Sequence, residues 1–281
     1  MAFTRAFEEH EVPPELKRVY SEVRNSFDLP FVPTLFKLLA VCPEYLRLVW
    51  ADLGDVVRSR EFHSASRALE ELVRSLVLKG GWRFSDQQRI LSAQKFTVDD
   101  VEAMAMIPPI FTRAVCHMLL FTRLMQRGYA GGQRGRTSDG KQAAALSRMI
   151  SLRIPNERDA GLRVWLIYSD IKKVTSSKSV MSMFRVLSPF PSYLAATWLD
   201  SKKILVEPSF HSAREQLAKR SMSLLVGLPV KDHRAAAKNL TPANWRDIEE
   251  TVDNFTRLMP QFALLSDVWH RSFLQVESAV A

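Results

Sequence analysis

The stretch VPTLFKLLAVCPEYLRLVW (Val32–Trp50) recurs in altered form as VMSMFRVLSPFPSYLAATW (Val180–Trp198), 148 positions later (180 − 32). The two stretches share valine, phenylalanine, two leucines, proline, tyrosine and tryptophan at equivalent positions. The tetrapeptide FHSA recurs at the same offset, at Phe62–Ala65 and at Phe210–Ala213. The matches keep their order along the chain, and the offset far exceeds the roughly 20–50 residues of solenoid repeats. We therefore expect one domain-sized unit that is used twice.

The later part of the predicted repeat has an offset of 144, where FTRAVCHMLLFT (Phe111–Thr122) matches FTRLMPQFALLS (Phe255–Ser266). A segment between the two copies holds half of the ten glycines of the chain. Because glycine weakens helical bias, we interpret this segment as a flexible connection. The sequence thus predicts a first helical repeat at 1–127, a linker at 128–149 and a second helical repeat at 150–281.

Both copies have the patterns of helices. Leu194 and Trp198 lie one helical turn apart on a common face. Pro43 and Pro191 suit the first turn of a helix, where no backbone donor is needed. The Thr97–Asp100 segment resembles a capping box before a helical run. The predicted class is all-α, with two tandem repeats packed as a pseudo-twofold dimer within one chain and a pocket between the repeats.

Composition limits the classes of function. The 281 residues carry a formal net charge of +9, but basic and acidic residues are interleaved and no nucleic-acid-reading motif is found. Two cysteines without a CxxC pair give no metal-ligand spacing and no disulfide framework, so we expect no metal site. Neither an apolar leader nor a run of about 18 apolar residues is found. We expect a cytoplasmic protein with no nucleic-acid or membrane partner.

The sequence resembles a known enzyme family over nearly its whole length. LPFVPTLFKLLAVCPEYLRLVWADL and IYSDIKKVTSSKSVMSMFRVLSPFPSYLAATWLD are similar to the first-repeat and second-repeat signatures of the group I (DehI-like) 2-haloacid dehalogenases. The resemblance implies cofactor-free hydrolysis of both enantiomers of short 2-haloalkanoic acids, with inversion at C2. In this family an Asp activates the water that displaces the halide, which is general-base catalysis.

One departure from the family pattern affects the expected chemistry. The family's Asp is expected before an aromatic–Arg pair, where this chain reads Ser182, Met183, Phe184 and Arg185. Methionine cannot accept a proton from water. A neighbouring family Asn would fall within 115–118, where this chain has none. We expect a dehalogenase-like hydrolase with Met183 at the Asp position. The alternatives are a diverged member with another reaction, such as ring opening or closure, and a non-catalytic binding protein.

The resemblance also suggests residues that would line a substrate pocket. These are Phe31, Thr34, Leu35, Ser179, Ser182 and Met183, for which the alternative is simple core packing. Arg113 and Arg257 stand at equivalent FTR positions and could hold a substrate carboxylate, or could form surface ion pairs. The expected partner is a small-molecule substrate, with a carboxylic acid as the first candidate. A homo-oligomer is left open.

Three residues are weak candidates for the base. His117 could replace the Asp because histidine titrates near neutral pH, or it could face solvent or a backbone carbonyl. Glu70 lies one turn after Ser66, and Asp170 is the nearest acid before the second signature but matches Glu22 as a paired surface acid. The histidines of the two FHSA segments are interpreted as structural or surface residues, because a metal would need further ligands.

Overall fold

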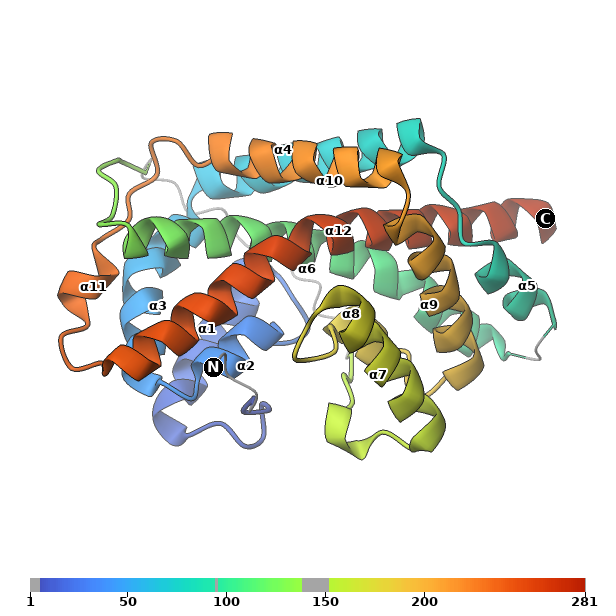
Figure 1. The fold of residues 1–281 in the computed structure, drawn as a ribbon, viewed down its shortest axis with the longest axis horizontal. Coiled ribbons are helices and arrows are strands. Elements are labelled where there is room, and N and C mark those ends of the chain that lie inside the picture. Colours follow the sequence, from blue (N-terminus) through green and yellow to red (C-terminus); the bar gives the residue numbers. More distant parts are fainter. Residues whose placement is uncertain (1–5, 94–95, 138–151, 281) are drawn as a thin grey trace. The chain divides into compact units, whose positions relative to one another are not determined.

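The computed structural model describes residues 6–93, 96–137 and 152–280, and this part of the chain is helical, as predicted (Figure 1). Its only extended pairing is one isolated bridge between Gln133 and Val230. The helices are α1 (Pro14–Phe27), α2 (Thr34–Leu39), α3 (Pro43–Arg58), α4 (Arg60–Gly80), α5 (Ser85–Ala93), α6 (Val98–Tyr129), η1 (Glu157–Asp159), α7 (Leu162–Thr175), α8 (Ser182–Arg185), α9 (Pro191–Leu205), α10 (Pro208–Ser223), α11 (His233–Ala236) and α12 (Pro242–Val280).

Predicted helix starts are confirmed at three places. Pro43 and Pro191 are the first residues of α3 and α9. Before α6, the Thr97 hydroxyl accepts from the Asp100 backbone N–H, and the Asp100 carboxylate accepts from the Thr97 N–H, both at 3.1 Å. This reciprocal pair satisfies two donors that the first turn of a helix cannot satisfy internally.

The chain divides into two compact units. Unit 1 comprises Met1–Leu69, Cys116–Leu152 and Lys219–Met259, and unit 2 comprises Glu70–Val115, Arg153–Ala218 and Pro260–Ala281. Four of the five unit boundaries therefore fall inside α4, α6, α10 and α12, and the fifth falls between Leu152 and Arg153. The predicted repeat boundaries at 127/128 and 149/150 are a different division of the chain and stay a prediction. Most of the predicted linker, 138–149, lies outside the described residues.

Unit 1 is built around an aromatic core. Helices α1, α2 and α11 pack against α3. The rings of Phe27 and Phe36 each contact Phe121, with centroids 5.8 and 5.0 Å apart. All three side chains are fully buried, and burying such rings contributes much of the apolar stabilisation of a core.

Unit 2 has a similar organisation. Helices α5 and α7 pack against α9. Phe184 contacts Trp198 and Phe262 at centroid distances of 5.5 and 6.0 Å. The Trp269 indole N–H donates to the Tyr193 hydroxyl at 2.7 Å, so the one donor of this buried indole is satisfied.

Two glycines in the described part of the predicted linker are closely packed, and the flexible connection as a whole stays a prediction. Gly128 belongs to α6, and a Cβ on it would lie 2.3 Å from Nδ1 of His233. A Cβ on Gly135 would lie 2.0 Å from the carbonyl oxygen of Gly227. At these two positions glycine is required because another segment of unit 1 approaches the backbone.

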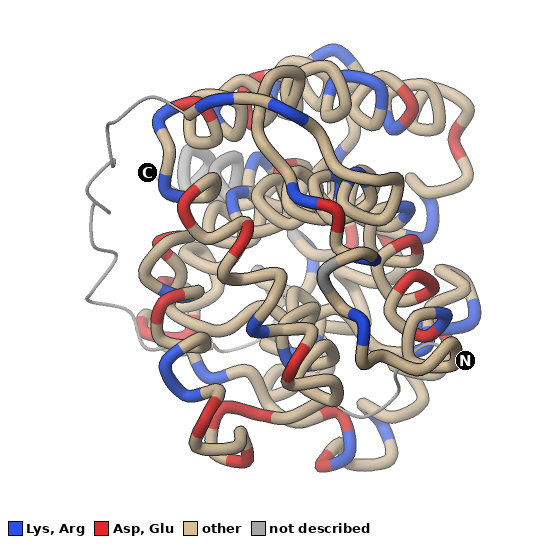
Figure 2. Tube along the Cα trace, turned by 90° about the vertical axis from the view of Figure 1, so that its left-hand side faces the viewer, with Lys and Arg blue, Asp and Glu red and all other residues tan. Residues whose placement is uncertain are grey.

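Helix α6 is long and apolar enough, by length and composition alone, to cross a membrane, a possibility that the sequence expectation did not anticipate. In the structure, 72% of its most apolar window is buried inside the protein, which is typical of a core helix. Basic and acidic positions are interleaved along the described helices, as the sequence predicts (Figure 2).

Candidate functional site

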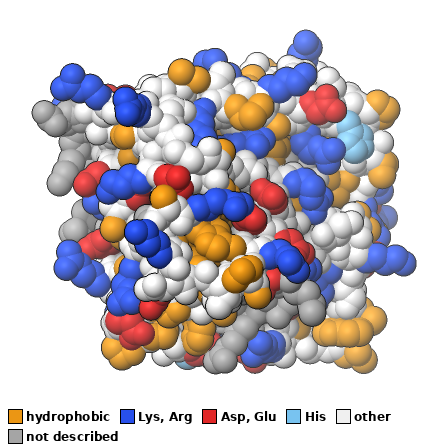
Figure 3. Space-filling view, turned by 60° about the vertical axis from the view of Figure 1, so that its left-hand side comes forward, with side chains coloured by type: hydrophobic (Ala, Val, Ile, Leu, Met, Phe, Trp, Pro, Cys, Tyr) orange, Lys and Arg blue, Asp and Glu red, His pale blue; other side chains and the backbone are white. Residues whose placement is uncertain are grey.

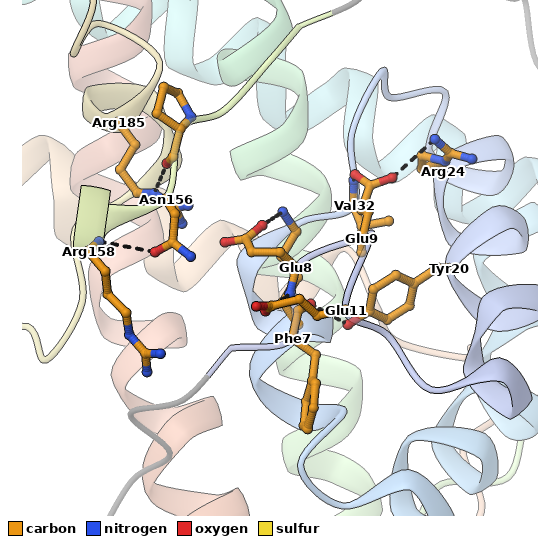
Figure 4. Close-up of polar contacts among 12 residues, drawn as sticks. Phe7, Glu8, Glu9, Glu11, Tyr20, Arg24, Val32, Asn156, Arg158 and Arg185 are labelled. Carbon is orange, nitrogen blue, oxygen red and sulfur yellow. Dashed lines mark hydrogen bonds and ion pairs between the residues drawn. The ribbon is translucent and has the colours of Figure 1, made fainter. Parts of the chain in front are cut away.

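The first signature segment, before α2 in unit 1, is held by a glutamate. Glu9 Oε1 accepts from the backbone N–H of Val32 at 2.9 Å, and its Oε2 pairs with Arg24 Nη1 at 3.1 Å (Figure 4). Charge-assisted bonds of this kind are stronger than neutral ones. The carboxylate therefore fixes the backbone two residues before the start of α2 and ties it to α1.

The second signature segment, in unit 2, is held in the same way. Glu157 Oε2 accepts from the backbone N–H of Val180 at 2.9 Å, and Oε1 pairs with Lys172 Nζ at 2.5 Å. Each of these residues stands 148 positions after its counterpart in unit 1. The two short helices α2 and α8 thus follow loops that are fixed by equivalent carboxylates.

The segments that precede α1 and η1 differ because of one proline. In unit 1 the Phe7 N–H donates to the Lys37 carbonyl at 3.0 Å. In unit 2 the equivalent residue is Pro155, which has no N–H, and the Arg185 carbonyl accepts from the Tyr168 hydroxyl at 3.5 Å instead. The Arg185 Nε in turn donates to the Pro155 carbonyl at 2.9 Å (Figure 4).

A buried cation lies in the last turn of each of the helices α2 and α8, but its surroundings differ in charge. Lys37 and Arg185 stand at equivalent positions, and each is 4% exposed. Glu8 supplies a carboxylate 2.6 Å from Lys37 Nζ. The equivalent residue of Glu8 is the neutral Asn156, whose side chain accepts from the Arg158 N–H and caps η1 (Figure 4).

The predicted pocket residues lie in or just before α2 and α8. Phe31, Thr34 and Leu35 are buried in unit 1, and Ser182 and Met183 are buried in unit 2. Ser179 is half-buried, and its carbonyl accepts from the Ser177 hydroxyl at 2.7 Å. The structure brings these residues together as two groups, one in each unit. Burial of this kind suits core packing as well as pocket lining.

The two arginines of the FTR positions lie on the surface. Arg113 and Arg257 are exposed. Arg257 Nη2 donates to Asn254 Oδ1 at 2.8 Å, one turn earlier in α12. Carboxylate binding and surface ion pairing both stay predictions for these arginines, because Asn254 is a neutral partner.

Two carboxylates, Asp170 and Glu70, are candidates for the general base, and each lies beside a positively charged side chain. Asp170 Oδ2 accepts from the Trp198 indole at 2.6 Å and from Lys202 at 2.7 Å, and these bonds lower the pKa of Asp170. A lowered pKa makes a carboxylate a weaker base. Glu70 Oε2 lies 3.8 Å from Arg74, one turn along α4.

His117 lies inside the aromatic core of unit 1 and is 3% exposed. Its ring is stacked on Phe62 at 5.9 Å and lies 5.5 Å from Phe27 and 6.0 Å from His63. The alternative of a solvent-facing histidine is therefore wrong, because rings from α1 and α4 contact the buried imidazole. Burial, together with Arg67, lowers the pKa of His63.

The carboxylates that fix the signature loops were not singled out from the sequence. Glu9 and Glu157 have the 148-residue offset, as do their basic partners, so extending the alignment toward the N-terminus would have paired them. The Glu8–Lys37 ion pair had no such signal because its counterpart positions hold Asn156 and Arg185. Among the described residues, no group of three or more His, Cys, Asp or Glu side chains is placed to hold a metal ion.

Comparison with known proteins identifies the family. The model of the halocarboxylic acid dehydrogenase DehI family matches residues 30–184, which cover nearly all of the first signature segment and the second only as far as Phe184. The chain belongs to the DehI family. Curated relatives are an (R)-2-haloacid dehalogenase of Pseudomonas putida, 23% identical over 81% of this chain and 77% of that protein, and one of Rhizobium sp. (strain NHG3), 21% identical over 80% and 88%.

Solved structures give the fold. A D-2-haloacid dehalogenase in complex with L-LA has a TM-score of 0.88 and 18% identity over 97% of both chains. A mutant D-2-haloacid dehalogenase in complex with D-2-CPA has a TM-score of 0.86 and 18% identity over 96% of both chains. The all-helical architecture of this DehI member is therefore the fold of D-2-haloacid dehalogenases.

Proposed function

We propose that this DehI member is a hydrolase that acts on a small 2-substituted carboxylic acid by direct displacement at an sp³ carbon. The observation that carries the proposal is its family membership, supported by relatives that are named (R)-2-haloacid dehalogenases. The names of these relatives make the (R) enantiomer the first substrate to test. The fold, net charge of +9 and absence of a metal-ligand pattern in the sequence are compatible with a cofactor-free reaction on an anion.

Met183 is the feature that separates this chain from the family chemistry. It is 1% exposed, and it lies between Ser182 and Phe184 in α8. A thioether can neither accept a proton from water nor carry a negative charge, so position 183 supplies no base. The proposed hydrolase would need another group to activate water, and Asp170, Glu70 and His117 remain weak candidates for that role.

We further propose that the chain is an internal duplication. Glu9, Arg24 and Val32 make the same contacts as Glu157, Lys172 and Val180, 148 positions later. The Trp50 indole donates to Glu22, and the Trp198 indole donates to Asp170, at the same offset. Such paired contacts support two copies of one ancestral unit. The pseudo-twofold packing, the pocket between the repeats, any homo-oligomer and the cytoplasmic location stay predictions.

The second candidate function is a diverged family member that carries out another reaction or only binds a small molecule. Met183 favours it, because an apolar side chain at the base position can line a binding pocket without supporting hydrolysis. The family arginine at 185 and serine at 182 would then serve binding alone.

Halide release decides between the two candidates. The purified protein is incubated with each enantiomer of 2-chloropropionate, and free halide is measured beside a control without protein. Hydrolysis predicts release above the control, with the (R) enantiomer preferred. No release from a protein that is folded by circular dichroism would contradict the proposed hydrolysis and favour a different ligand.

A further inference from the structure

Unit 1 contains a cavity of about 690 Å³ that lies outside the signature segments. It is formed by the start of α4, the segment that follows α6, and the end of α10 with the loop that follows it. Its lining residues are Arg60, Glu61, Ser64, Ala65, Ala68, Arg136, Arg220, Leu224, Val226, Gly227 and Leu228. Nothing in the expected hydrolytic chemistry uses these residues.

The cavity has an excess of positive charge. Arg60, Arg136 and Arg220 line it from three separate parts of the chain, against the single carboxylate of Glu61. Arg220 Nη1 donates to Ser223 Oγ at 3.4 Å, a neutral partner, and no ion pair of the three guanidinium groups is found among the described residues. The formal balance of these four side chains matches a ligand with two negative charges.

The backbone that carries Arg136 is held in place. Gln133 and Val230 exchange two backbone hydrogen bonds of 2.7 and 2.9 Å. The Arg136 N–H donates to the Gly227 carbonyl at 3.2 Å, and Gly135 packs directly on that carbonyl. A guanidinium on a fixed backbone loses less conformational freedom when it binds a ligand.

The cavity also has an apolar side. Ala65 and Leu228 are 4% and 3% exposed and contribute to its lining together with Ala68 and Leu224. A small inorganic anion would make no contact with this apolar surface. On the face drawn in Figure 3, basic side chains lie among acidic and hydrophobic ones, so a broad electrostatic field for a polymer is not evident.

The cavity combines parts of both predicted repeats, because the first repeat supplies Arg60 and Glu61 and the second supplies Arg220. At the 148-residue offset, Arg60 corresponds to Pro208 and Glu61 corresponds to Ser209. Arg136 belongs to the segment that joins the copies. The positions that the repeat relates to Arg60 and Glu61 are uncharged, so this charged lining is not a shared feature of the two repeats.

We propose that this cavity binds a phosphate monoester with an apolar body. A phosphate monoester carries about −1.5 to −2 charge at pH 7 and three acceptor oxygens. Arginine matches such oxygens with pairs of parallel hydrogen bonds, and the apolar lining would contact the body of the ligand. A monocarboxylate of the same size would neutralise less of the charge.

Isothermal titration calorimetry with phenyl phosphate tests the proposal on the full chain. Phenyl phosphate is expected to bind more tightly than inorganic phosphate, which lacks the apolar body, and more tightly than benzoate, which lacks the second charge. Arg60→Ala, Arg136→Ala and Arg220→Ala should each weaken phenyl phosphate binding by about tenfold or more, because each loses charge-assisted hydrogen bonds.

Arg47→Ala is the matched control, because Arg47 is exposed on α3 in the same unit and does not line the cavity. It should bind phenyl phosphate like the unmodified protein. Arg60→Lys keeps the charge but not the forked geometry, so intermediate affinity is expected from a variant that folds normally. The proposal is overturned if no saturable binding is measured, or if Arg47→Ala weakens binding as much as the cavity variants. Binding is scored directly, so the result is independent of halide release.

Discussion

Glu8 and Lys37 form an ion pair inside unit 1, with Oε2 2.6 Å from Nζ and with side chains only 9% and 4% exposed. Removing one partner of a buried pair leaves the other charge without compensation in a poorly solvating interior. We expect Glu8→Gln to lower the free energy of unfolding by about 3 kcal/mol. Urea denaturation at pH 7, followed by circular dichroism, measures this loss.

Two further variants make this test specific. Glu8→Gln combined with Lys37→Met removes both charges, so much of the lost stability should return. Asp55→Asn breaks an exposed pair with Arg58, in which Asp55 is 74% exposed, and should cost about 0–1 kcal/mol. Equal losses in Glu8→Gln and Asp55→Asn would contradict a special role for the buried pair.

The two loop-fixing glutamates should have matching effects. Glu9→Gln and Glu157→Gln each weaken the hydrogen bond to a backbone N–H and remove one ion pair with a basic residue. Because these side chains are partly exposed, we expect each substitution to cost about 1 kcal/mol. Denaturation curves of the two variants should shift together, and a large effect of only one would argue against equivalent loops.

His63 should make stability depend on pH near neutrality. Burial first, and then the charge of Arg67, lower its pKa below 6.5, although Asp28 opposes them. The unfolded chain therefore binds the proton more readily, and this contribution to stability is lost as pH falls below about 6.5. His63→Gln should reduce the fall in unfolding free energy between pH 7.5 and pH 5.5.

The equivalent histidine provides the control for this pH experiment. His211 stands 148 positions after His63 and is exposed. His211→Gln is expected to keep the slope of the unmodified protein. A pH slope that is unchanged in His63→Gln would mean that another group, such as the adjacent His117, carries the dependence.

Met183→Asp should restore an acid at the family position. A buried carboxyl has a raised pKa, which favours proton acceptance near neutral pH if water reaches it. We expect halide release from (R)-2-chloropropionate to increase about tenfold or more over the unmodified protein. Leu35→Asp, the equivalent change in unit 1, should give no increase. A folded Met183→Asp variant without a gain would mean that position 183 is not the missing base position.

The local chemistry of this fold was largely readable from the sequence. Pro43, Pro191 and Thr97 start helices by rules that depend only on neighbouring residues. Phe62 and Phe210, the first residues of the repeated FHSA segments, are both fully buried. Such features are predictable because a helix start or an apolar anchor is encoded within a few residues.

Contacts between distant segments were not predictable in the same way. Arg136 reaches the cavity only because Gln133 pairs with Val230, and no local pattern encodes that pairing. The division into compact units also escaped the sequence, because it falls within continuous helices that have uniform helical patterns on both sides. The activity of the candidate site stayed open because Met183 removes the residue that would have identified the base.

The positions of the unit boundaries have a consequence for the chain as a polypeptide. Each unit contains segments that come before position 137 in the chain and segments that come after it. A protein cut there would give two fragments, and neither would contain a whole unit. Separately produced fragments should therefore remain unfolded or aggregate alone and regain structure only when mixed or co-expressed. Position 137 is therefore a suitable place to split the protein, because folded structure would be measured only when the two fragments reassemble.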